Sequence, residues 1–198
     1  MGIDAIYNRR SIRKYKPDKV SIDILNEILE AGRAAPSGKN KQPWKFFVYG
    51  GEKKEELLSA MKSGIERERK GQAFLPDSRA GLPDAWNTLR IMGEAPVIIM
   101  VLNTEGKSPF DCIMADERVT EIVDTLSIGA AIENMLLKAE DLGIGTLWIA
   151  NTCFAYPELI KYMNTEKQLV GAIALGYANE KPEARPRKKL SDIVEYYL

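Results

Sequence analysis

The sequence predicts a β-sheet with helices packed over it, of mixed α/β or α+β class. Apolar strand-like runs alternate with segments of helical periodicity along the 198 residues. The run APVIIMVLN is continuously apolar from 97 to 102, as expected of a strand covered on both faces. Hydrophobic residues make up 45% of the chain, which is enough for one well-buried core. Without an internal repeat or a long linker, we expect one domain over residues 1–198.

The first half of the chain contains three predicted helices and one predicted strand. A short helix is expected over residues 2–9. Ser21 is a suitable N-cap for the next, whose apolar residues recur at helical spacing up to about Ala34. Pro36-Ser37-Gly38 ends that helix, and WKFFVYG (44–50) follows as a β-rich strand. Residues 52–68 are charged and helix-prone, with a thin apolar face.

The second half continues the alternation. Residues 71–85 contain two glycines and two prolines, which indicates a surface loop or a broken helix before a helix at 86–92. Residues 103–116 are expected to be irregular. The longest helix is predicted over 118–142, ended by Gly143, with the small residues Gly129-Ala130-Ala131 at its middle. The strand GTLWIA, a short helix at 156–163 and the strand LVGAIALGY complete the pattern.

Composition excludes several classes of protein. Lysine plus arginine equals aspartate plus glutamate, 28 each, so a generic nucleic-acid binder is not expected. There is no histidine, which removes Ser–His–Asp and Cys–His nucleophile activation and the usual zinc sites. No apolar run is long enough to span a bilayer, and two cysteines without a CxxC favour the cytoplasm. A cofactor or a tuned carboxylate, lysine or tyrosine must therefore carry any redox or acid–base chemistry.

Four short motifs could form a site, and each has a structural alternative. NRRSIRKY near the start and RPRKK near the end offer arginine forks suited to a phosphate, or they are a solvated helix end and a solvated tail. APSGKNKQPW offers backbone N–H groups and amides that could contact a planar heterocycle, or it is a plain helix-to-strand connection. GIGTLWIAN ends a buried strand, where ligands of α/β proteins often bind. No GxGxxG or Walker loop is present.

In this order and spacing, the four motifs resemble the nitroreductase family of flavin-dependent oxidoreductases, and the resemblance covers nearly the whole chain. It implies an α+β fold in which a central, mixed but mostly antiparallel sheet is flanked by helices. It also implies an intertwined homodimer with FMN bound at the subunit interface, each site being built from both chains.

The resemblance assigns roles to individual residues. Arg9, Arg10 and Ser11 match positions that hold the phosphate and ribityl chain, and Arg13 matches one near the pyrimidine edge of the ring. The loop donated by the partner subunit matches Pro36, Ser37 and Asn40, and the ring contacts on a helix match Asn87 and Arg90. The backbone amides facing the reactive flavin nitrogen match Ala150 and Asn151, and the C-terminal phosphate grip matches Arg185 and Arg187.

The implied activity is transfer of reducing equivalents from NADH or NADPH, through bound FMN, to nitroaromatic, quinone or similar electron-poor acceptors in a ping-pong scheme. Arg13 and Arg90 would stabilise negative charge on the reduced ring. No residue beyond the flavin is expected to act as a dedicated catalyst, and no metal is expected. The alternatives are a reductive dehalogenase or a flavin-fragmenting enzyme on the same scaffold, or a non-catalytic flavin-binding module.

The chain departs from the family pattern at two positions. Gly38 stands where many relatives have a second serine, which removes one possible hydroxyl contact. Ala150 stands where some members carry glutamate, so no acidic group is expected to act there.

Overall fold

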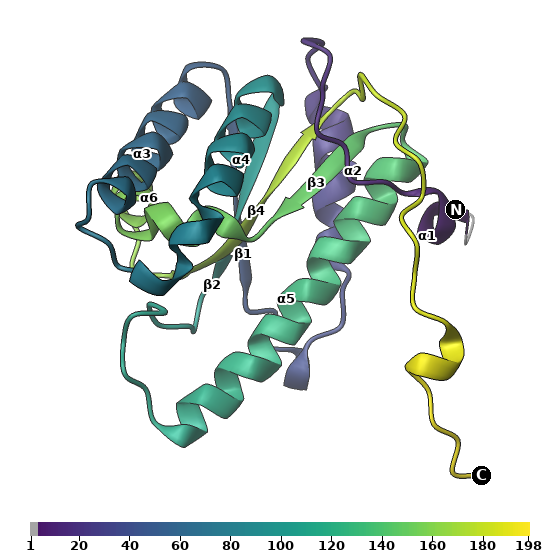
Figure 1. The fold of residues 1–198 in the computed structure, drawn as a ribbon. Coiled ribbons are helices and arrows are strands. Elements are labelled where there is room, and N and C mark those ends of the chain that lie inside the picture. The colour runs from purple at the N-terminus through teal and green to yellow at the C-terminus, as the bar shows by residue number, and fades with distance from the viewer. Residues whose placement is uncertain (1–3) are drawn as a thin grey trace.

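A four-stranded antiparallel sheet forms the centre of the molecule (Figure 1). The structure is a computed structural model that describes residues 4–198. The strands are β1 (Trp44–Gly50), β2 (Val97–Asn103), β3 (Gly145–Ile149) and β4 (Gln168–Gly176), in the order β1-β2-β4-β3. The predicted α+β class with a mostly antiparallel sheet is confirmed. A parallel bridge between Ser11 and Thr146 adds to the antiparallel strands at the β3 edge.

Helices cover both faces of this sheet. On one face lie α3 (Gly51–Arg69), α4 (Leu82–Glu94) and α6 (Tyr156–Met163), and on the other α2 (Ile22–Arg33) and α5 (Ala115–Asp141). The N-terminal α1 (Asp4–Asn8) packs near α5. Four 3₁₀ turns complete the described chain: η1 (Gly38–Asn40), η2 (Pro76–Gly81), η3 (Asn151–Ala155) and η4 (Leu190–Asp192).

Each predicted strand is present, and the helices differ from the prediction mainly at their starts. Ser21 caps α2, because its hydroxyl accepts the Ile24 N–H at 3.3 Å. The helix expected at 86–92 begins at Leu82, since Pro83 occupies its first turn, where a missing N–H costs no hydrogen bond. The first two residues of the helix expected at 2–9 lie outside the described residues.

The core is divided by β2, whose seven residues are all buried. Ile98, Met100 and Leu102 belong to the cluster under α3, α4 and α6, and Val97, Ile99 and Val101 to the cluster under α2 and α5. This alternation is the two-residue period of a strand with apolar layers on both faces. The prediction of a doubly covered strand is therefore confirmed.

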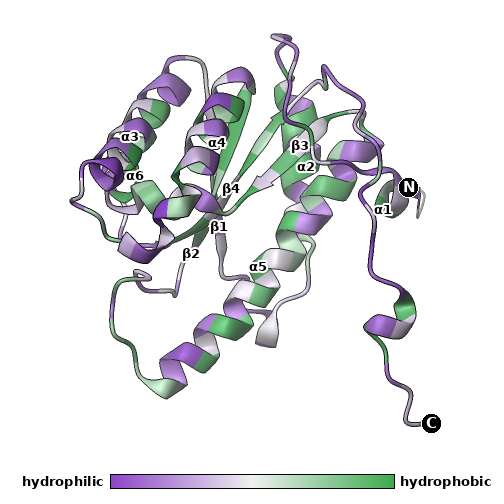
Figure 2. Cartoon of the chain, in the orientation of Figure 1, coloured by the Kyte–Doolittle hydropathy of each residue, from purple (hydrophilic) through white to green (hydrophobic). Residues whose placement is uncertain are grey.

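Helix α5 packs closely on α2 and leaves an apolar stripe exposed. A Cβ on Gly32 of α2 would approach Met135 Cγ at 2.8 Å, and Ala131 is fully buried there. Of the small residues at the middle of α5, Ala131 thus packs within the chain, whereas Gly129 and Ala130 are partly exposed. Towards its N-terminus, four exposed apolar residues recur at helical spacing, Val119, Ile122, Val123 and Leu126; in Figure 2 hydrophobic and hydrophilic bands alternate along this part of α5.

Among the described helices, none combines the length and the apolar character needed to cross a membrane.

Candidate functional site

A pocket of about 230 Å³ lies where β3 ends, beside α4. Its lining includes Arg13, Trp148, Ala150 and Asn151. The segment before Arg13 is fixed against β3: Ile12 N–H donates to Thr146 O at 2.9 Å, and a Cβ on Gly145 would lie 2.8 Å from Ile12. Because this segment pairs parallel to β3, it delivers Arg13 to the same end of the sheet as Ala150 and Asn151. The structure thus brings together three residues that sequence reasoning singled out.

The side chain of Asn151 is held by α4 and keeps one unpaired atom. Its Nδ2 donates to Asp84 Oδ2 and to Thr88 Oγ1, each at 2.9 Å. Its Oδ1 is buried and has no hydrogen-bond partner within the described chain. A buried polar atom without a partner is costly, so a ligand that donates a hydrogen bond would be favoured here.

Helix α4 lines this pocket with one face, which does not include Asn87 and Arg90. The pocket is lined by Asp84, Thr88 and Ile91, which share one side of the helix. Asn87 and Arg90 lie on the neighbouring exposed side, where the Arg90 guanidinium donates to Asn87 Oδ1 at 3.0 Å and pairs with Glu94. Sequence reasoning missed Asp84 and Thr88; their spacing of four residues was the signal, once the helix is started at Leu82.

The basic N-terminal segment is ordered by backbone contacts. Arg10 Nη1 donates to Tyr7 O at 2.6 Å and to Arg9 O at 2.8 Å. Arg9 Nε is buried and has no hydrogen-bond partner within the described chain, its nearest carboxylate oxygen being that of Glu133 at 3.6 Å. A guanidinium N–H with unused bonding capacity is suited to an anion.

The two ends of the chain meet beside this segment. Asn179 N–H donates to Lys14 O at 2.9 Å, and the Glu180 carboxylate accepts a hydrogen bond from the backbone N–H of Arg13. Arg10 lines a pocket of about 530 Å³ together with the start of the C-terminal tail, residues 178 and 180–182. Arg185 and Arg187 follow further along the tail and are exposed; the tail itself, in yellow, runs away from the sheet in Figure 1. The chain thus brings its N-terminal basic segment to the start of its tail.

The predicted loop at Pro36–Asn40 lies against α5, away from the Arg13 pocket. Gly38 N–H donates to Ser127 Oγ at 3.3 Å, and Lys41 Nζ binds both carboxylate oxygens of the buried Asp124 at 3.0 and 2.7 Å. Neither Pro36, Ser37 nor Asn40 is among the residues that line the Arg13 pocket. Within one chain, this loop therefore does not contribute to the pocket that Arg13 lines.

The same loop is strained, and its glycine has a steric reason. Lys39, Asn40 and Gln42 have φ of 53°, 55° and 51°, a left-handed conformation that is uncommon for residues other than glycine. A Cβ on Gly38 would lie 2.7 Å from Val123 Cγ1. The serine expected at position 38 in many relatives would clash with Val123 here.

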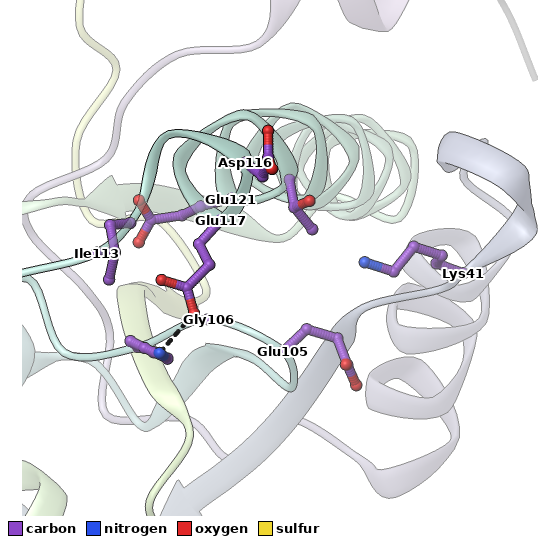
Figure 3. A pocket seen from close by; sticks show the side chains of 9 residues that line it. Lys41, Glu105, Gly106, Ile113, Asp116, Glu117 and Glu121 are labelled. Carbon is purple, nitrogen blue, oxygen red and sulfur yellow. Dashed lines mark hydrogen bonds and ion pairs between the residues drawn. The ribbon is translucent and has the colours of Figure 1, made fainter.

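A third pocket lies beside this loop and is lined by four carboxylates and two lysines (Figure 3). It measures about 270 Å³ and lies between the N-terminal turns of α5 and the segment after β2. Glu117 is already paired with Lys107 at 2.6 Å, and Lys41 with Asp124. Among the described residues, no group of histidine, cysteine, aspartate and glutamate side chains could hold a metal. The carboxylates make this pocket unsuited to a phosphate.

The chain belongs to the nitroreductase family, because the model of the Nitroreductase family matches residues 6–177. This confirms the resemblance that the four motifs indicated. The match spans the basic N-terminal segment, all four strands and the end of β3.

Relatives and solved structures agree with this membership. The chain is 29% identical over 187 residues to an Archaeoglobus fulgidus protein named "Putative NADH dehydrogenase/NAD(P)H nitroreductase", covering 90% of this chain and 86% of that one. It is 27% identical over 206 residues to an iodotyrosine deiodinase of Thermotoga neapolitana, covering 99% and 97%. A Desulfovibrio desulfuricans structure, described as a "putative nitroreductase in complex with FMN", superposes with a TM-score of 0.72 at 26% identity, covering 99% and 96%.

Proposed function

We propose that this protein is an FMN-dependent oxidoreductase that passes reducing equivalents from NADH or NADPH to an electron-poor acceptor such as a nitroaromatic or a quinone. The observation that carries the proposal is the grouping of Arg13, Ala150 and Asn151 in one pocket at the end of β3. Family membership and the relatives named for NAD(P)H-dependent nitroreduction support the same activity. The absence of histidine fits, since a flavin would supply the electron chemistry itself.

The residues present fit a flavin phosphate ester in two respects. Arg9 Nε is a buried donor without a hydrogen bond, which suits an anion, and Asn151 Oδ1 is a buried acceptor without a hydrogen bond, which suits a ring N–H. Arg13 would place a fixed positive charge near the ring and favour its negatively charged reduced form. Arg185 and Arg187, which are exposed on the tail, would supply two further guanidinium groups for the phosphate.

We propose that two subunits complete each site. The loop at Pro36–Asn40 is separate from the Arg13 pocket in one chain, as it must be if it contributes to the partner's flavin. It packs against Val123 and Ser127 of α5, next to the exposed stripe of Val119, Ile122 and Leu126. A contiguous exposed apolar stripe is typical of an interaction surface, and a symmetric contact would bury it against itself. The homodimer would thereby carry each loop towards the other subunit.

A reductive dehalogenase is the second candidate, favoured by the similarity to an iodotyrosine deiodinase over nearly the whole chain. The two activities differ in the acceptor and share the flavin and its pocket. A cytoplasmic location accords with two cysteines that are both free in the structure, Cys112 and Cys153.

The test is anaerobic, two-stage kinetics on the FMN-loaded protein. NADH or NADPH should bleach the flavin absorbance in the first stage, and adding a nitroaromatic, a quinone or a halotyrosine to the reduced protein should restore it in the second. Restoration by the halotyrosine alone would favour the dehalogenase. In an Arg13→Ala variant, NADH or NADPH should reduce the bound flavin at least about tenfold more slowly than in the wild type, or the variant should lose FMN. A protein that binds FMN but is not bleached by either nucleotide would be a binding module, and the proposed activity would be wrong.

A further inference from the structure

A fourth cavity lies beside α6, and three aromatic rings contribute to its lining. It is an open cleft of about 760 Å³, within the range of small-molecule sites. Phe74, Phe110 and Tyr156 line it from three separate segments of the chain, and Ser108 and Lys161 add polar groups. We call it the aromatic cleft.

Buried charges hold Phe74 in place at the edge of the cleft. The Glu68 carboxylate, only 1% exposed, accepts the N–H of Phe74 at 2.9 Å and that of Leu75 at 3.3 Å. The Arg67 guanidinium lies 4.5 Å from the Phe74 ring centre and is itself fixed by Glu158 at 2.7 Å. Yet the Phe74 side chain remains about half exposed (51%). An exposed ring that buried charges hold in position is preorganised to bind a ligand.

The rings are arranged so that a further planar group can be added. Phe74 and Phe110 are 5.3 Å apart with planes tilted by 47°, and Phe110 meets Tyr156 edge-on at 5.7 Å and 84°. Because the rings are tilted, they do not cover each other's faces fully. Aromatic side chains of this kind bind nucleobases by stacking, with little dependence on the base.

The position of the cleft relates it to the candidate flavin pocket. Asn151 lines the pocket and Tyr156 lines the cleft, and the five residues of η3 join them. At about 2 Å of rise per residue in a 3₁₀ helix, the two ends of this segment lie roughly 10 Å apart. A ligand confined to the cleft could not react in the pocket, whereas an extended ligand with two ring systems is long enough to span this separation.

We propose that the aromatic cleft binds the adenosine end of NADH or NADPH while the nicotinamide end reaches the flavin pocket; this inference rests on the proposed function. In a nicotinamide dinucleotide the two ring systems are separated by two riboses and a pyrophosphate, which suits two sites joined by a short segment. Lys161 supplies a cation for the phosphates. Since Glu166 also lines the cleft, its charge is mixed, and stacking of the adenine contributes most of the binding.

The experiment compares two donors on the FMN-loaded full-length protein. NADH or NADPH carries the adenosine, and reduced nicotinamide mononucleotide lacks it. For Phe74→Leu and Phe110→Leu, the ratio of kcat/KM for the dinucleotide to that for the mononucleotide should fall about tenfold. The matched control is Tyr49→Leu, which removes a ring from another tilted pair, Tyr49–Tyr162, outside the cleft; it should keep the wild-type ratio.

A second readout does not depend on turnover. ADP-ribose, which has the adenosine end and no nicotinamide, should bind the wild-type protein in a calorimetric titration and bind Phe74→Leu about tenfold more weakly. The inference is overturned if ADP-ribose does not bind the wild-type protein. It is also overturned if the donor ratio is unaltered in both cleft variants, or if these variants raise KM for the acceptor instead. Failure of both donors to reduce the wild-type protein would overturn the proposed function itself.

Discussion

The Asn151 side-chain amide donates to Asp84 Oδ2 at 2.9 Å, and this hydrogen bond joins the end of β3 to the first turn of α4. The same nitrogen lies 2.9 Å from Thr88 Oγ1. Two acceptors on one helix face therefore fix which way the carboxamide is turned. As a result its oxygen, unpaired within the described chain, is the atom available to a ligand.

Loss of the Asp84 contact should weaken flavin binding. In Asp84→Ala the Asn151 carboxamide is held by Thr88 Oγ1 alone and is less firmly oriented, so the dissociation constant for FMN should rise about fivefold, the equivalent of one hydrogen bond of about 1 kcal/mol. Flavin fluorescence titration measures this. Asp77→Ala, at an exposed carboxylate of η2, is the control and should retain wild-type affinity. Equal affinity in both variants would show that Asn151 does not contact the flavin.

Features with a local signal could be predicted from the sequence, and contacts between distant segments could not. Strand periodicity and the Ser21 cap are local signals, so the strands and the start of α2 could be predicted directly. The start of α4 was missed because Gly81 and Pro83 were taken as loop residues, although proline is compatible with a first helical turn. Starting that helix too late hid the alignment of Asp84 with Thr88. Contacts between distant segments, such as that between Gly38 and Val123, have no local sequence signal.

The C-terminal arginines should act through the phosphate. Replacing Arg185 and Arg187 together with alanine should raise the FMN dissociation constant at least tenfold, since each charge-assisted hydrogen bond contributes about 1.5–3 kcal/mol. Riboflavin, which has no phosphate, serves as the matched ligand, and its affinity should be nearly the same in variant and wild type. An equal loss for both flavins would mean that the tail acts on the ring or on folding.

A charge in the exposed stripe of α5 should separate the subunits. Leu126 is 71% exposed in the single chain, so Leu126→Glu should leave the monomer fold intact while placing a carboxylate in the proposed symmetric contact. Sedimentation velocity should show a dimer for the wild type and a monomer with weakened FMN binding for the variant. Ile22→Glu, at an exposed position of α2, is the control. A wild-type protein that is a flavin-loaded monomer would contradict the shared site.

The Glu68 network should make stability depend on pH. Burial alone would raise the pKa of Glu68, but hydrogen bonds from Phe74 N–H, Arg67 and Leu75 N–H outweigh it and lower that pKa. The stabilisation is therefore complete above the unfolded pKa of about 4.3 and is lost as the pH falls through the lower folded pKa.

Urea unfolding of Glu68→Gln measures this dependence. At pH 7 the variant should lose about 2 kcal/mol of unfolding free energy, and the difference from wild type should shrink as the pH falls below about 4. Glu66→Gln, a partly exposed carboxylate on the same helix, should differ little from wild type at either pH. A difference that is independent of pH would show that the Glu68 charge is not what stabilises the loop.

The visible absorption spectrum of the purified protein, recorded before and after addition of FMN, tests the central claim most directly. If arginines from both ends of the chain and the pocket at the end of β3 hold the flavin, the protein should retain one FMN per chain through gel filtration. It should also show the shifted absorption band of a bound flavin. A protein that is colourless as isolated and that releases all added FMN on the column would contradict this account.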